Sequence, residues 1–191
     1  MPPKARISKE MIMEEAFQIA RTEGADRITA RSISERLKCS TQPVLYYFET
    51  VAEIKAAVYE KVNEYHTQWL MNMERDYGNP MLNIGMNYIR FAVEEKNLFR
   101  FLFQSNEFSG ISLNDLIQSE DIEEMMQVCG EEAGVTAEEA KEIFTLIFVF
   151  AHGYASMFAN NEMVYEETVL ETALTKAFLG AMYAAKEEIN E

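Results

Sequence analysis

Much of the chain places apolar residues three or four positions apart, the spacing of one face of an α-helix. Such a stripe predicts a helix from Ser8 to Glu23, and Gly24 ends it where a left-handed residue is usual. A longer helix is predicted from about Thr50 to beyond Met71, with a buried stripe at Ile54, Val58, Val62, Tyr65 and Trp69. Sustained alternation of apolar and polar residues is absent, so the sequence predicts an all-α fold.

Between these helices, the segment Thr29–Phe48 contains two short helical patterns joined by a tight connection. Thr29 is a good N-cap, because its hydroxyl can accept from an unpaired amide of the first turn. Ile33 and Leu37 lie four residues apart and predict the buried face of the first helix. After a three-residue turn, we expect Ser40 to cap a second helix.

The second short helix is predicted to have a distinct inner and outer face. Val44 and Phe48 are four residues apart and point inward. Polar and aromatic side chains remain largely outside, at Thr41, Gln42, Pro43, Tyr46 and Tyr47. Two short helices, a three-residue turn and exposed polar tips indicate a helix-turn-helix, a motif that reads DNA.

The rest of the chain predicts a larger helical region. Pro80 opens one helix, Leu98–Phe103 forms a short aromatic helix, residues 104–120 form a loop, and a further helix lies near residues 121–129. Thr136 starts a capping box ahead of Ile143–Asn161, a run without Asp, Glu, Lys or Arg. Because this run contains His152 and lacks basic flanks, we expect a fully buried central helix and no membrane span.

The last predicted helix, from about residue 166 to residue 188, carries a stripe of small side chains flanked by larger apolar ones. A narrow stripe lets another helix approach closely, and two copies packed face to face would form a four-helix interface. The sequence therefore predicts a homodimer, with interface residues Ala173, Leu174, Ala177, Phe178 and Ala181.

The net charge of −15 at pH 7 is distributed unevenly. Residues 1–61 contain ten Lys and Arg against nine Asp and Glu, whereas residues 62–191 contain seven against 23. Phosphate affinity depends on local positive charge, so a near-neutral N-terminal region with a few directed cations can still bind DNA. The charge pattern permits a DNA partner without establishing one.

Other features argue against an enzyme or a secreted protein. Cys39 and Cys129 form no spaced metal motif, so we expect reduced thiols and a cytoplasmic protein. The sequence has no Gly-rich phosphate loop or nucleophile elbow, and neither His66 nor His152 has a glutamate three residues earlier. The N-terminus MPPKARIS lacks the apolar run of a signal peptide. We therefore expect no catalytic residue, no metal and no cofactor.

The segment from Ser8 to about Tyr59 resembles the TetR family of bacterial transcriptional regulators, through ARTEGADRITARSI, STQPVLYYF and the helix that follows. A softer likeness, in GMNYIRFAVEEKNLFRFLF and the final helix pair, extends toward the C-terminus. The resemblance implies a helix-turn-helix domain at residues 1–50, a linking helix to about residue 61, and a helical ligand-binding and dimerisation domain at residues 51–191. It also implies a homodimeric repressor that binds a palindromic double-stranded operator and is released by a small molecule.

The resemblance further implies base or phosphate contacts for Arg31, Thr41, Gln42, Pro43, Tyr46, Tyr47 and Lys55. An amide such as that of Gln42 suits adenine, and Pro43 suits a thymine methyl group. The chain departs from the family pattern at the turn, where Lys38 replaces a common glycine, and in the recognition helix, where Gln42 and Leu45 replace a common glycine and tyrosine. Val51 stands where a phosphate-binding lysine is usual, and Lys55 follows one turn later.

Aromatic residues of the larger domain suit a small apolar or amphipathic effector. The candidates are Tyr65, Trp69, Tyr88, Phe91, Phe103, Phe148 and His152. For each of them, an aromatic-rich core without a ligand is the alternative. For the whole chain, the alternative is a small-molecule-binding or interaction protein of the same fold that no longer reads DNA.

Overall fold

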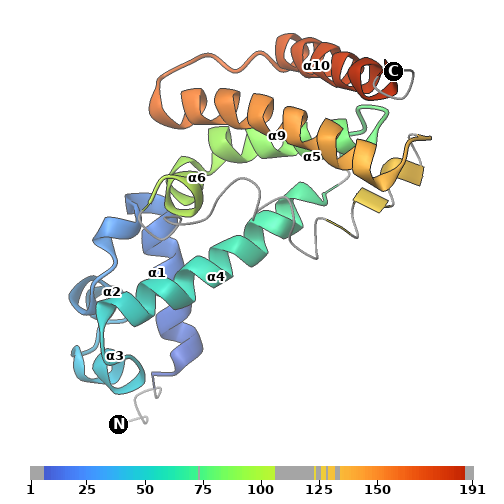
Figure 1. Cartoon of the computed structure of the whole chain (residues 1–191). Helices are drawn as coiled ribbons and strands as arrows, with labels where there is room; N and C mark the ends of the chain where they lie inside the picture. The colour runs from blue at the N-terminus through green and yellow to red at the C-terminus, as the bar shows by residue number, and fades with distance from the viewer. Residues whose placement is uncertain are drawn as a thin grey trace. The chain divides into compact units, whose positions relative to one another are not determined.

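The protein is described by a computed structural model over residues 7–72, 74–105, 123, 126–127, 129–131 and 134–187. All regular elements in these residues are helices, so the predicted all-α fold is confirmed. They are α1 (Lys9–Glu23), the short 3₁₀ helix η1 (Ala25–Arg27), α2 (Ala30–Arg36), α3 (Gln42–Tyr47), α4 (Val51–Leu70), α5 (Pro80–Glu94), α6 (Lys96–Phe103), α9 (Ala137–Asn160) and α10 (Glu167–Glu187) (Figure 1). The predicted loop at 104–120 and helix at 121–129 lie almost entirely outside the described residues.

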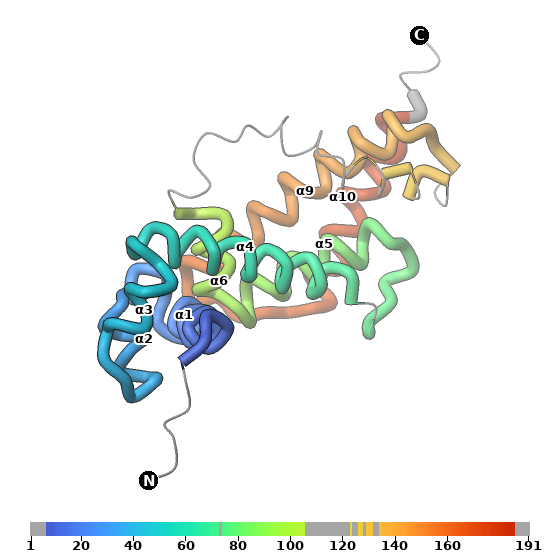
Figure 2. The backbone as a smooth tube through the Cα atoms, turned by 90° about the horizontal axis from the view of Figure 1, so that it is seen from below, coloured from blue at the N-terminus to red at the C-terminus, as the bar shows by residue number. Residues whose placement is uncertain are grey.

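Contacts divide the chain into two compact units that alternate along the sequence. Unit 1 comprises Met1–Thr67 and Glu95–Ser109, and unit 2 comprises Gln68–Glu94 and Gly110–Glu191. Helix α6 therefore belongs to the same unit as α1, although α5 of unit 2 precedes it in the chain (Figure 2). The division expected at residue 50 remains a prediction.

Local capping defines the helices of unit 1. The Ser8 hydroxyl accepts from the Met11 amide at 3.3 Å, and Gly24 ends α1 with a φ of 95°. Thr29 and Ser32 cap α2 reciprocally, since each side chain accepts from the other residue's amide at 3.0 Å. These two caps and the glycine stop agree with the sequence prediction.

Helix α4 is shorter than predicted and buries a different residue near its end. It contains 20 residues and ends at Leu70. Its buried stripe is Ile54, Val58, Val62 and His66, each four residues after the last. The prediction that this stripe includes Tyr65 and Trp69 is wrong. The buried positions continue at intervals of four residues after Val62, so His66 lies on the buried side of the helix. Tyr65 and Trp69 lie next to this stripe and are half-buried.

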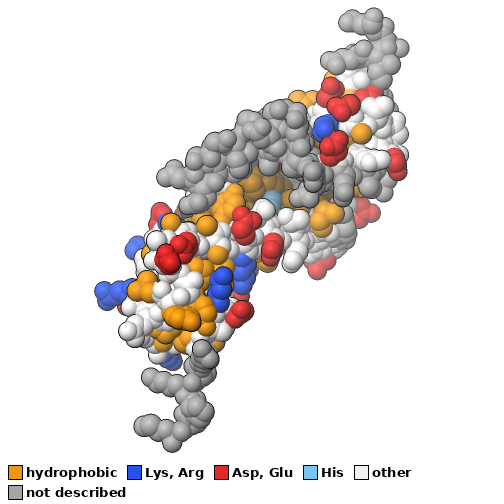
Figure 3. Space-filling view, turned by 60° about the horizontal axis from the view of Figure 1, so that its bottom comes forward, with side chains coloured by type: hydrophobic (Ala, Val, Ile, Leu, Met, Phe, Trp, Pro, Cys, Tyr) orange, Lys and Arg blue, Asp and Glu red, His pale blue; other side chains and the backbone are white. Residues whose placement is uncertain are grey.

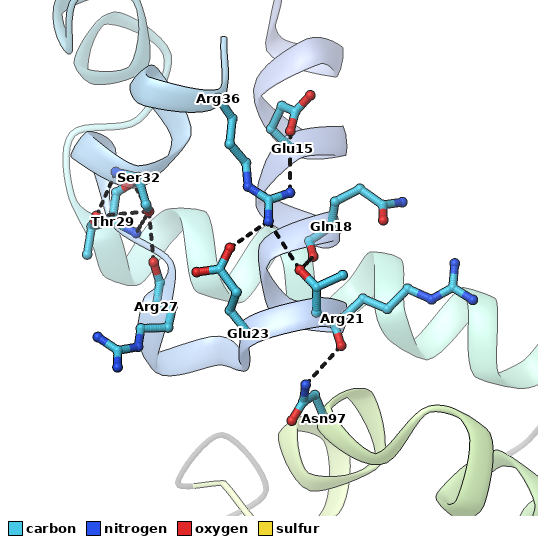
Figure 4. Close-up of polar contacts among 10 residues, drawn as sticks. Glu15, Gln18, Arg21, Glu23, Arg27, Thr29, Ser32, Arg36 and Asn97 are labelled. Atoms are coloured by element: carbon cyan, nitrogen blue, oxygen red, sulfur yellow. Dashed lines mark hydrogen bonds and ion pairs between the residues drawn. The ribbon is translucent and has the colours of Figure 1, made fainter. Parts of the chain in front are cut away.

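A buried ion pair joins three helices of unit 1. Glu95, which directly precedes α6, is only 5% exposed, and its carboxylate accepts from both Nε and Nη2 of Arg21 on α1. The Tyr65 hydroxyl on α4 donates to Glu95 Oε1 at 3.1 Å. On the same side, Asn97 Nδ2 donates to the carbonyl oxygen of Arg21 at 2.9 Å (Figure 4). The hydrogen bonds from Arg21 to Glu95 raise the pKa of the guanidinium.

Arg36 connects α2 to α1 (Figure 4). Its Nη2 lies 2.6 Å from Glu23 Oε1, and its Nη1 lies 3.7 Å from Glu15 Oε2. Nη2 also donates to the Thr22 hydroxyl at 3.1 Å. Arg36 thus fixes the first helix of the helix-turn-helix on the underlying helix.

Unit 2 is built around α5, most of whose residues are buried and which contacts both α9 and α10 (Figure 1). At Gly85, an added Cβ would lie 2.9 Å from Leu174 Cδ2 on α10 and 3.5 Å from Ile147 Cγ2 on α9. The buried amide of Asn87 donates to the carbonyl oxygens of Leu70 at 3.0 Å and Asn72 at 2.7 Å. The close packing at Gly85 holds α9 and α10 against α5, and the two hydrogen bonds of Asn87 attach the end of α4 to α5.

Helix α9 has one buried and one exposed face. Within the described residues it is the single helix long and apolar enough to cross a membrane by length and composition. Ile143, Ile147 and Ala151 are buried, whereas Leu146 and Val149 are exposed. The prediction of a fully buried central helix is therefore wrong for a single chain, because α5 and α10 pack against one side of α9 while Leu146 and Val149 stay exposed.

Candidate functional site

The turn of the helix-turn-helix closes on a lysine in a left-handed conformation. Lys38 has a φ of 52°, and no other non-glycine residue among those described has a positive φ. Its amide donates to the Glu35 carbonyl at 3.2 Å, and the next amide, of Cys39, donates to the Ser34 carbonyl at 3.0 Å. The turn therefore keeps its geometry although a side chain replaces the usual glycine.

We expect Lys38→Gly to raise the free energy of unfolding by about 1 kcal/mol, because a Cβ in the left-handed region clashes with the following carbonyl oxygen. Lys38→Ala removes the charge but keeps the Cβ, so it should leave stability nearly unchanged. Urea unfolding followed by far-UV circular dichroism measures both variants. Equal stabilisation by alanine and glycine would assign the effect to charge.

Helix α3 presents a well-defined outer face. Val44 and Phe48 are buried, as predicted, and Gln42, Leu45 and Tyr46 are exposed. Thr41 is the N-cap residue, and no side-chain oxygen caps the helix. The prediction that Ser40 caps α3 is thus wrong. The capping position has helical backbone angles, φ −71° and ψ −14°, whereas a capping side chain usually requires extended ones.

Two tyrosines and a proline form a shallow depression beside this face. Its volume is about 340 Å³, and its lining residues are Ile7, Pro43, Tyr46 and Tyr47. The two tyrosine rings meet edge to face with centroids 5.1 Å apart, and the Tyr47 hydroxyl donates to the Ile7 carbonyl at 3.5 Å. Tyr46 is 78% exposed, whereas Tyr47 is half-buried. Figure 3 shows hydrophobic side chains together with Lys and Arg side chains at the surface of this unit.

The two predicted phosphate ligands outside α3 carry acidic neighbours. Arg31 Nε lies 2.9 Å from Glu35 Oε1, in an exposed pair one turn apart on α2. Lys55 Nζ lies 3.6 Å from Asp26 Oδ1, whose side chain is fully exposed. In both pairs the carboxylate is well exposed, and such pairs contribute little to stability, so phosphate oxygens can replace the carboxylates.

One residue of the surface was missing from the sequence prediction. Leu45 is 51% exposed on α3, three residues after Gln42 and therefore on the same face. A large apolar side chain at an outward position of the second short helix was visible in the sequence. The family resemblance places a tyrosine at this position and therefore gives no role to a leucine.

In unit 2 the structure brings together three of the predicted effector residues. The Tyr88 hydroxyl lies 2.8 Å from His152 Nδ1, and the Phe148 ring lies 5.6 Å from the Tyr88 ring and 5.8 Å from the His152 ring, centroid to centroid. Burial raises the pKa of Tyr88 and lowers the pKa of His152, so both groups are neutral at pH 7. The cluster offers aromatic surface around one polar pair.

The remaining effector candidates separate into two places. Trp69 and Phe91 meet in unit 2 with centroids 5.7 Å apart, and Trp69 Nε1 donates to the Asn87 carbonyl at 3.1 Å. Tyr65 and Phe103 lie in unit 1, where Tyr65 contacts Phe17 with centroids 5.6 Å apart. Their part in ligand binding stays a prediction.

The predicted dimer residues lie mostly inside the chain's own core. Leu174, Phe178 and Ala181 are buried, and Ala173 and Ala177 are half-buried. The exposed large apolar residues of the last two helices lie on other faces, at Leu146, Val149, Met157, Val169, Leu179 and Tyr183. An interface role for the first five residues stays a prediction.

No protein-family profile and no curated protein matches the sequence. Among solved structures, the crystal structure of a TetR transcriptional regulator from Rhodococcus sp. RHA1 is similar, with a TM-score of 0.53 and 15% sequence identity over 91% of this chain and 94% of that one. The chain shares the fold of that regulator. At this identity the likeness extends to the fold alone.

Proposed function

We propose that the chain is a sequence-specific DNA-binding transcriptional regulator. The observation that carries the proposal is the outer face of α3, which exposes Gln42, Leu45 and Tyr46 while α1 and α2 support its inner side. A short helix that presents amide, apolar and phenolic groups outward has the form of a recognition helix in a major groove. The likeness to a solved TetR regulator supports the same reading.

The same proposal includes a homodimer that binds a palindromic operator. The exposed apolar residues of α9 and α10 support it, because a second copy packed on these helices would remove them from water. Two recognition helices would then reach half-sites about one helical turn, roughly 34–36 Å, apart. The protein acts in the cytoplasm, where its operator is.

We further propose that a small apolar or amphipathic effector releases the repressor from DNA. The Tyr88, Phe148 and His152 cluster supports an effector of this class, because it combines aromatic surface with a neutral polar pair. We propose this cluster as the effector site. It lies in unit 2, whereas the proposed DNA-binding helix α3 lies in unit 1.

Binding to duplex DNA from the region upstream of the protein's own gene tests the proposal. In a gel-shift experiment we expect the Gln42→Ala/Tyr46→Ala variant to bind at least tenfold more weakly than the wild type, because it loses base and phosphate hydrogen bonds. Both side chains are exposed, so the variant should keep its far-UV circular dichroism. Wild-type protein that binds no duplex even at low salt would contradict the proposal. It would favour the alternative, a ligand-binding or interaction protein of the same fold, for which Val51 and Lys38 are the departures from the family pattern.

A further inference from the structure

We propose that α3 reads A·T base pairs, with Gln42 on adenine and Leu45 on the C5 methyl group of thymine. This inference rests on the proposed DNA-binding function and names the bases that α3 selects. Gln42 and Leu45 lie three residues apart on α3, and both are exposed. The buried side chain of Val44 lies between them in sequence and holds their face outward.

The composition of α3 restricts which bases it can recognise. The helix reads QPVLYY and contains no Lys, Arg, Asp or Glu. Guanine presents two acceptors that an Arg or Lys reads, and cytosine presents an amino group that a carboxylate reads. Adenine presents one acceptor and one donor, which match the oxygen and nitrogen of an amide. Among the residues of α3, Gln42 supplies the amide that recognises adenine.

The apolar side chains of α3 provide the complementary contact to thymine. Leu45 is 51% exposed. Elsewhere on α3, Pro43 and Tyr46 line the depression of about 340 Å³ together with Ile7 and Tyr47. Among the four bases, thymine presents a methyl group in the major groove, and apolar side chains recognise it. A methyl group packed on the exposed part of Leu45 loses contact with water, which favours binding.

The experiment separates the methyl group from every other feature of the base pair. The wild-type protein first selects duplexes from a random-sequence pool, and these selected duplexes serve as the probes. Each thymine of the selected half-site is then replaced by deoxyuridine, which lacks only the C5 methyl group. We expect at least one position where this replacement weakens wild-type binding about fourfold, the value for one buried methyl group.

Two variants and one control assign the contacts to residues. Leu45→Ala should bind the thymine and deoxyuridine duplexes equally at that position. Gln42→Ala should lose about tenfold discrimination between A·T and the other base pairs at one neighbouring position. Val164→Ala, a substitution of another exposed apolar residue that lies in unit 2, should keep the wild-type pattern.

The failures of the two proposals are distinguishable. The selected duplexes could bind tightly and carry G·C pairs at the discriminated positions, or show no deoxyuridine effect at any position. Either result would overturn the base assignment and would leave the proposed DNA-binding function intact. A Leu45→Ala variant that still distinguishes thymine from deoxyuridine would overturn the role of Leu45. Failure to select any duplex would overturn both the assignment and the proposed function.

Discussion

Replacing Arg21 by methionine is expected to lower the free energy of unfolding by about 3 kcal/mol, whereas Glu95→Gln should lower it by only about 1 kcal/mol. The asymmetry follows from burial. The Glu95 side chain is 5% exposed, so without Arg21 its charge is left in the interior with the Tyr65 hydroxyl as its remaining hydrogen-bond donor among those described above. Arg21 is 41% exposed, so water can hydrate its guanidinium when Glu95 is neutralised.

Urea unfolding of the two single variants and of Arg21→Met/Glu95→Gln measures this asymmetry. The double variant should be more stable than Arg21→Met alone, because no charge then remains in the interior. Lys61→Met provides a matched control, since Lys61 pairs with Glu14 at 2.5 Å between exposed or half-buried side chains. That control should cost below about 1 kcal/mol. Equal losses from Arg21→Met and Glu95→Gln would show that Glu95 is accessible to water.

Lowering the pH from about 7 to about 5 is expected to destabilise unit 1 by about 2 kcal/mol through His66, at 1.36 kcal/mol per pH unit. Burial lowers the pKa of His66 from 6.5 to about 4, and its ring packs on Phe103 with centroids 5.2 Å apart. Below pH 6.5 the unfolded chain binds a proton that the folded chain rejects. The contribution of His66 is therefore complete above pH 6.5 and is lost as the pH falls toward 4.

The variant His66→Met should flatten this pH dependence, whatever its stability at pH 7. His152→Gln is the comparison, because the pKa of His152 is also lowered by burial but its side chain is less buried. This second variant should keep most of the wild-type slope. A wild-type slope in His66→Met would contradict the assignment to His66, and carboxylates would then account for the loss.

Features set by neighbouring residues were accessible from the sequence. The cap at Ser8, the cap at Thr29 and the stop at Gly24 involve partners at most five residues away, so residue types and spacing determine them. The inner face of α3 followed from Val44 and Phe48 for the same reason.

Features set by distant residues were not accessible. Arg21 and Glu95 are 74 residues apart, and each alone reads as an ordinary charge on a helix. On α9, apolar composition predicted burial, but whether Leu146 and Val149 are covered depends on which elements surround the helix. On α10, a stripe of small residues is compatible with packing inside one chain or between two, and periodicity does not distinguish these cases.

The position of α6 has a consequence for how the protein can be divided. Unit 1 takes its last described helix from beyond α5, so no continuous piece of the chain contains that unit alone. A fragment ending after α4 would keep the helix-turn-helix and lose Glu95, leaving Arg21 without its carboxylate and the α1 surface under α6 open to water. A gene fusion that exchanges only the first 70 residues would transfer unit 1 without α6. An exchange of the whole of unit 1 between two proteins has to include both of its segments, Met1–Thr67 and Glu95–Ser109.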